Sequence, residues 1–156
     1  MTLAPEEQSS TKILVPVSTF VDKVRLFRAL QALSTKNPLV VLFRLVEVPR
    51  QTTPLDPDLW KDDIKEAEDF LAKPAMWLRA EGYRVENKVV TARDAAEGII
   101  AEANNGGYTV VLLTKRRIRS GWGRIFHKSI SEEVIRYTNT LVLTFLAEPQ
   151  VEEMKR

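Results

Sequence analysis

The residues best suited to chemistry lie in one basic stretch, TKRRIRSGWGRIFHKSIS, at positions 114–131. It has no acidic residue, it holds the only histidine of the chain, His127, and its cations are Lys115, Arg116, Arg117, Arg119, Arg124 and Lys128. A cationic loop that leads into a helix is suited to an anion, because the helix start offers free N–H groups. The stretch therefore predicts either an anion site, a surface for another partner or a solvated loop.

Two nucleotide-binding motifs do not fit this stretch. A Walker P-loop ending on Lys128 and Ser129 would need glycine at 122 and 127, where the chain has Trp122 and His127. The Gly-x-Gly at 121–123 lacks the third glycine and the preceding strand of a dinucleotide fingerprint. The stretch is therefore not a phosphate loop of either kind.

The sequence offers little support for a catalytic site or a metal site. His127 has serines nearby, but no carboxylate is placed to orient it, so we predict no catalytic residues and no enzyme activity. The chain has no cysteine and one histidine, which argues against thiolate and multi-imidazole metal sites. The acidic residues of 62–68 are interleaved with Lys61 and Lys65, a pattern typical of a solvated helix face. We therefore predict no metal.

Length and composition indicate one globular domain. The chain has 156 residues, 44% of them hydrophobic, and a net charge of +2, too small to imply nucleic acid by itself. No apolar run approaches the roughly 20 residues of a membrane span. We expect a cytoplasmic protein with a flexible leader at 1–10, a domain at 11–147 and a polar tail at 148–156.

The apolar pattern predicts five strands. They are expected at 12–18, 38–48, 83–90, 108–114 and 141–146. Four of them are nearly continuous apolar runs, which suit parallel strands buried on both faces. The third, 83–90, alternates more and is expected at an edge or half exposed.

Four helical patterns alternate with the strands. They are expected at 22–34, 56–82, 93–107 and 128–139. The first places Val24, Phe27, Leu30 and Leu33 on one face. Pro74 should kink or interrupt the second, since proline lacks the N–H donor. Gly82 is suited to end that helix.

This alternation predicts an α/β fold with an open, mostly parallel five-stranded sheet and helices on both faces. Ligands of such sheets bind beyond the carboxyl ends of the strands, where the strand order reverses. The positions of interest are therefore 18–20, 46–49 and the segment that starts at Thr114.

Between about residues 11 and 147 the chain resembles the universal stress protein family. KILVPVS and LVVLFRLVEVP are similar to the first two strands of that family, and VVTARDAAEGIIAEA to the segment that enters its third helix. RSGWGRIFHKSISEEVIRYTNTLVL is similar to its nucleotide loop, last helix and last strand. The resemblance implies the adenine-nucleotide alpha hydrolase-like fold.

The resemblance also implies where a nucleotide would bind. ATP-binding members carry Gly-x2-Gly-x9-Gly-[Ser/Thr] after the fourth strand and an Asp at the end of the first. Here the glycine positions hold Thr114, Arg117 and Lys128, with ten residues instead of nine in the long gap, and the Asp position holds Ser18. The candidate nucleotide or anion site is Pro16, Val17, Ser18, Thr19, Leu45, Thr114, Arg117, Lys128, Ser129, Ile130 and Ser131.

These departures leave alternatives open. A Cβ at a glycine position fills space that a phosphate would need, so we expect ordinary ATP binding to be largely lost. The cations then form a solvated or partner-binding surface, or they hold an anion through their side chains. No cofactor is certain; ATP, AMP or another nucleotide are the candidates.

The leading hypothesis is a non-catalytic signalling or regulatory domain. The resemblance implies a homodimer through the last strand, with Leu141, Val142, Leu143, Thr144 and Phe145 as the candidate interface. The alternative is a cytoplasmic regulatory domain or partner of a membrane transporter that binds a nucleotide or other anion through the loop at 115–128. Nucleic acid is not favoured, because one short basic cluster is thin support.

Overall fold

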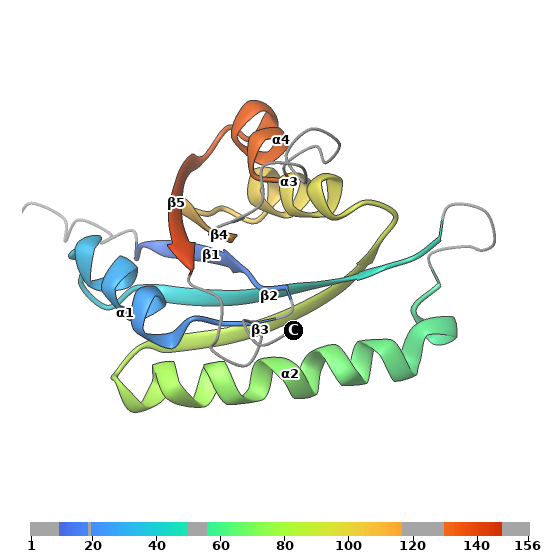
Figure 1. Cartoon of the computed structure of the whole chain (residues 1–156), viewed down its shortest axis with the longest axis horizontal. Helices are drawn as coiled ribbons and strands as arrows, with labels where there is room; N and C mark the ends of the chain where they lie inside the picture. The colour runs from blue at the N-terminus through green and yellow to red at the C-terminus, as the bar shows by residue number, and fades with distance from the viewer. Residues whose placement is uncertain (1–9, 19, 50–55, 117–129, 148–156) are drawn as a thin grey trace, which may run out of the picture.

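The computed structural model describes residues 10–18, 20–49, 56–116 and 130–147, and it shows one sheet between two layers of helices (Figure 1). The elements, in chain order, are β1 (Lys12–Pro16), α1 (Lys23–Ala32), β2 (Leu39–Glu47), a 3₁₀ turn (Pro57–Trp60), α2 (Lys61–Ala80), β3 (Arg84–Ala92), α3 (Ala95–Asn105), β4 (Val110–Arg116), α4 (Ile130–Tyr137) and β5 (Leu141–Ala147). The predicted alternation of strands and helices is confirmed.

All pairings in the sheet are parallel, in the order β3-β2-β1-β4-β5. The strand order therefore reverses between β1 and β4, and β3 lies at an edge as predicted. The expectation that β5 is buried on both faces was wrong, because β5 forms the other edge. Leu141 and Leu143 on β5 are 63% and 36% exposed.

The two faces of the sheet form separate apolar clusters, which explains the continuous apolar runs. On β1, Ile13 and Val15 pack in the cluster of α1 and α2, whereas Leu14 packs in the cluster of α3 and α4. Figure 1 shows α2 beneath the sheet and α3 and α4 above it. Because helices cover both faces, the central strands carry apolar residues at successive positions along most of their length.

The buried face of α1 differs from the prediction at one residue. Leu26 and Leu30 lie one turn apart and are buried against the sheet. Val24 is 59% exposed, because two residues of helix rotate it by about 200° from Leu26. Its assignment to the core face was therefore wrong.

Helix α2 runs without interruption through Pro74, so of the predicted kink or interruption the interruption was wrong. Pro74 is buried beside Leu71 and Leu78, and this packing against the sheet offsets the missing backbone hydrogen bond. The helix ends at Ala80, and Gly82 terminates it as predicted, two residues later, with a φ of 90° and a hydrogen bond from its N–H to the Arg79 carbonyl. Within the ranges described above, no helix is both long and apolar enough to cross a membrane.

Candidate functional site

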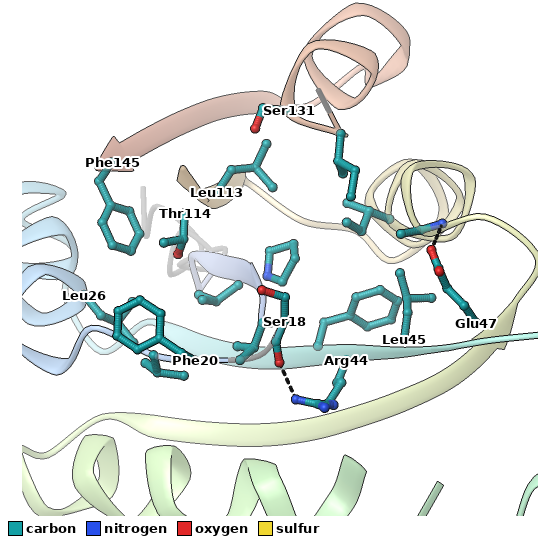
Figure 2. A pocket seen from close by; sticks show the side chains of 18 residues that line it. Ser18, Phe20, Leu26, Arg44, Leu45, Glu47, Leu113, Thr114, Ser131 and Phe145 are labelled. Atoms are coloured by element: carbon teal, nitrogen blue, oxygen red, sulfur yellow. Dashed lines mark hydrogen bonds between the residues drawn. The ribbon is translucent and has the colours of Figure 1, made fainter. Parts of the chain in front are cut away.

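A cavity of about 450 Å³ lies at the carboxyl ends of β1 and β4 (Figure 2). This is the point at which the strand order reverses, and open α/β sheets bind their ligands there. The volume falls in the range of small-molecule sites, roughly 300–1,000 Å³. The cavity is therefore the candidate functional site.

The structure brings most of the predicted site residues together around this cavity. Those that line it are Pro16, Val17, Ser18, Leu45, Thr114, Ile130 and Ser131. They come from β1, β2, β4 and α4 and are far apart in the sequence. The remaining candidates, Thr19, Arg117, Lys128 and Ser129, lie outside the described residues.

Ser18 is held at the floor of the cavity by Arg44, a residue that the sequence did not single out. The guanidinium Nη1 of Arg44 donates to the Ser18 carbonyl, and Figure 2 shows the hydroxyl of Ser18 on the cavity side. The guanidinium also lies over the ring of Phe70 on α2, 4.1 Å from its centroid. Arg44 therefore fixes the chain after β1 and links it to α2.

A second charged side chain, Glu47 at the end of β2, borders the amino end of α3. Its Oε1 accepts a hydrogen bond from the Ala95 N–H at 3.1 Å. One turn into the helix, Oδ1 of the N-cap residue Asp94 accepts from the Glu97 N–H at 3.0 Å. The chain's own carboxylates thus satisfy this helix start. This side of the cavity favours a hydrogen-bond donor on a ligand over an anion.

The opposite wall is apolar and aromatic. Phe20 from the loop after β1, Leu26 from α1 and Phe145 from β5 line it. Phe20 lies in the segment predicted to border a ligand. Phe145 was predicted for the dimer interface, and the structure places it in the cavity wall.

Hydroxyl groups supply most of the remaining polarity of the cavity. Ser18, Thr114 and Ser131 surround the same opening (Figure 2). Such neutral groups can donate to and accept from sugar hydroxyls or ring nitrogens. Among the described residues, no three histidine, cysteine, aspartate or glutamate side chains come together as a metal site. The acidic residues of α2 between 62 and 69 are exposed, as a solvated face requires.

A different polar cluster lies at the amino end of the sheet and was not predicted. The Tyr108 hydroxyl donates to Oε1 of Glu102 at 2.7 Å, and Nζ of Lys88 donates to the same oxygen at 2.9 Å. The ammonium of Lys12 lies 4.6 Å from the centre of the Tyr108 ring and donates to the Gly106 carbonyl at 2.8 Å. This amino-end cluster joins the start of β1, the segment before β4, the middle of β3 and the last turns of α3.

The pKa values of the cluster follow from these contacts. Burial raises the pKa of Tyr108 well above its ordinary value, and the hydrogen bond to Glu102 adds to the effect. Burial also raises the pKa of Glu102, but the hydrogen bonds from Tyr108 and Lys88 outweigh it, so that the net pKa is lowered. The cluster is held together by a charged carboxylate and a neutral phenol.

The sequence pattern of the universal stress protein family matches residues 10–145. The chain belongs to the universal stress protein family. The resemblance expected from the strands and the segment before α3 is thereby confirmed. No curated protein matches this family member in a sequence comparison.

Solved structures of universal stress proteins share the fold. UspA from Lactobacillus plantarum has a TM-score of 0.67 and 17% identity, covering 86% of this chain and 97% of its own. The protein from Archaeoglobus fulgidus in complex with dAMP has a TM-score of 0.61, 20% identity and coverage of 86% and 96%. The Arabidopsis thaliana protein with AMP bound has a TM-score of 0.61, 18% identity and coverage of 92% and 95%. These similarities confirm the five-stranded α/β fold.

Proposed function

We propose that this universal stress protein is a non-catalytic regulatory domain that binds a nucleoside or nucleoside monophosphate in the cavity. The observation that carries the proposal is the cavity of about 450 Å³ at the switch point, lined by most of the residues that the family's nucleotide site predicts. Its apolar walls are suited to a base, and its hydroxyls to a sugar. Relatives of the same fold have been solved with dAMP and with AMP, which supports this ligand class.

The same residues argue against ordinary ATP binding. The glycine positions of the family loop hold Thr114, Arg117 and Lys128, and each adds a Cβ where the backbone approaches phosphates. Ser18 stands in place of an acid, so a ribose hydroxyl loses a charged acceptor. We therefore expect the triphosphate tail to contribute little affinity.

The regulatory, non-catalytic role is supported by the kind of polar group in the described cavity wall. Ser18 and Arg44 are bonded to each other through the Ser18 carbonyl, and Glu47 is bonded to the start of α3. These groups hold the wall in place instead of forming a nucleophile–base pair. Binding, with a change in the surface that a partner sees, is the function that this arrangement supports best.

Calorimetry with adenosine, AMP, cyclic AMP and ATP tests the proposal. We expect AMP to bind more tightly than ATP. Thr114→Trp should abolish binding, because Thr114 lines the cavity. Lys115→Trp is the matched control, since the adjacent Lys115 is exposed and outside the wall. Failure of the wild type to bind any of the four ligands would refute the proposal, and tighter binding of ATP would refute the loss of the ATP motif.

The proposal includes a homodimer through β5. This strand is an edge of the sheet, and Leu141 and Leu143 expose apolar surface on it. We expect Leu143→Lys to convert the dimer to a monomer in sedimentation experiments. Ile135→Lys on α4 is the matched control, because Ile135 is an exposed apolar residue off the strand. A wild type that is monomeric at micromolar concentration would overturn this part.

The alternative is a regulatory domain or partner of a membrane transporter that binds a nucleotide or other anion through the loop at 115–128, most of which lies outside the described residues. It stays a prediction from the sequence, as does a cytoplasmic location.

A further inference from the structure

Leu45 on β2 lies in the cavity wall and its side chain points toward α3 (Figure 2). The residue that faces it on α3 is Gly98. A Cβ placed on Gly98 would lie 2.5 Å from Cδ2 of Leu45 and 3.3 Å from its Cδ1. Leu45 therefore occupies space that every residue other than glycine would fill.

The backbone gives no other reason for a glycine at this position. Gly98 is not among the glycines with a positive φ, and it lies in the first half of α3 (Ala95–Asn105). Glycine is less favourable than alanine inside a helix, because it loses more backbone entropy on folding. The close approach of Leu45 is thus the feature that a glycine serves here.

An added methyl group would move Leu45 in one direction. The backbone of Leu45 is fixed by parallel pairing with Val90, and the Ala92 Cβ on β3 would lie 3.0 Å from the same added methyl on Gly98. Pairing with β3 thus prevents Leu45 from moving within the plane of the sheet. The added methyl group on α3 would occupy the space in which the Leu45 side chain now lies. The side chain would rotate toward the cavity that it already borders.

We infer that Gly98 is a specificity-determining residue of the cavity. By seating Leu45 against α3, it keeps the β2 side of the cavity wide enough for a bicyclic base and favours purine over pyrimidine rings. This inference rests on the proposed nucleoside or nucleotide binding. Gly98 itself acts through Leu45 as a positioning residue.

The test compares AMP with CMP by calorimetry on the wild type, Gly98→Ala and Gly98→Ala/Leu45→Ala. We expect Gly98→Ala to weaken AMP binding about tenfold or more and CMP binding much less, since one methylene in a tight pocket discriminates about 10- to 200-fold. The second substitution should restore AMP binding, because it removes the displaced side chain. An unchanged ratio of AMP to CMP affinity in Gly98→Ala would overturn the inference.

A control substitution separates the cavity from the helix. Gly106→Ala at the other end of α3 also creates a clash, with Cε2 of Tyr108, but Gly106 does not line the cavity. We expect it to lower stability and leave the AMP to CMP ratio unchanged. Equal loss of AMP affinity in Gly98→Ala and Gly106→Ala would show that helix damage, and not Leu45, is responsible.

A double-mutant cycle in urea unfolding needs no ligand. Gly98→Ala should lower the unfolding midpoint when Leu45 is present and lower it much less in the Leu45→Ala background, where only the Ala92 Cβ stays close and the helix preference of alanine remains. The same change of the unfolding midpoint in both backgrounds would show that Leu45 does not pack against Gly98. Absence of any nucleotide binding by the wild type would instead refute the proposed function and the selectivity that rests on it.

Discussion

The two ends of the sheet use their polar residues in opposite ways. At the amino end, the Tyr108 hydroxyl and the Lys88 ammonium both donate to Glu102, whose pKa is lowered by these contacts, while burial and the hydrogen bond to Glu102 raise the pKa of Tyr108. At the carboxyl end, the hydroxyls of Ser18 and Ser131 surround an open cavity. The amino end therefore contributes to stability, and the carboxyl end is available for a ligand.

This contrast explains why a polar cluster alone does not identify a functional site. Glu102 and Tyr108 of the amino-end cluster have shifted pKa values, yet the donors and acceptors of the cluster already have partners inside the protein. The cavity has ordinary groups that lack such a closed network. Substitutions should therefore separate the two regions, one by unfolding free energy and the other by ligand affinity.

The largest expected effect is on stability, from Tyr108→Ala at the amino end. Tyr108 is buried, and the truncation removes its ring contacts, its hydrogen bond to Glu102 and the ring beneath Lys12. We expect a loss of about 3 kcal/mol in urea unfolding. Tyr108→Phe should lose only about 1 kcal/mol, since it keeps the ring. A change in AMP affinity of the folded Tyr108→Phe protein would contradict the separation of stability at the amino end from ligand binding at the carboxyl end.

The next largest effect is on affinity, from Ser18→Asp at the carboxyl end. A carboxylate there gives a ribose hydroxyl a charged acceptor, worth about 1.5 kcal/mol, or roughly a tenfold gain in AMP affinity by calorimetry. The isosteric Ser18→Asn is the control and should gain little. Equal gains with both residues would show that charge is not what the site lacks.

Glu102→Gln should have a smaller effect that depends on pH. The folded-state pKa of Glu102 is lowered, so its carboxylate stabilises the fold above its unfolded pKa, and that contribution is lost as the pH falls through the folded pKa. We expect a loss of about 1 kcal/mol at pH 7 that disappears in strong acid. Urea unfolding across this range measures it, with the exposed Glu97→Gln as the control. A loss that is constant with pH would contradict the role of the charge.

The smallest effect compares two arginines that bond to loop carbonyls at opposite ends. Arg44 donates to Ser18 beside the cavity, whereas Arg84 donates to the Asn37 carbonyl at the amino end. Replacing either with methionine should cost about 0.5–1 kcal/mol of stability. We expect only Arg44→Met to weaken AMP binding, by roughly threefold. Equal effects on AMP affinity would show that Arg44 does not position the cavity floor.

The sequence was sufficient to predict the order of the elements and much of the cavity. The central strands are apolar along most of their length, and residues at their carboxyl ends, such as Ser18, Leu45 and Thr114, meet wherever parallel strands pair. One local signal at a helix end also held, since Gly82 follows the end of α2. These features depend on short-range patterns.

The features that the sequence did not predict depend on tertiary contacts. Continuous apolar runs do not reveal which strand lies at the edge, so the apolar pattern alone predicted a buried β5, and only the family resemblance indicated this strand as an interface. Arg44 became part of the site because Phe70 and the Ser18 carbonyl both lie within its reach. Gly98 carries no motif, and its importance comes from one methyl group on a strand far away in the sequence. Packing between elements decides such positions.

Pro74 has a consequence beyond the continuity of α2. Having no N–H, it cannot donate to the carbonyl of Phe70, four residues earlier in the helix. Phe70 is the residue whose ring lies under Arg44. The turn of α2 nearest the cavity floor thus has one backbone bond fewer than its neighbours. Amide exchange in the middle of α2 should be fastest there, and a bound ligand that tightens Ser18 and Arg44 should slow it.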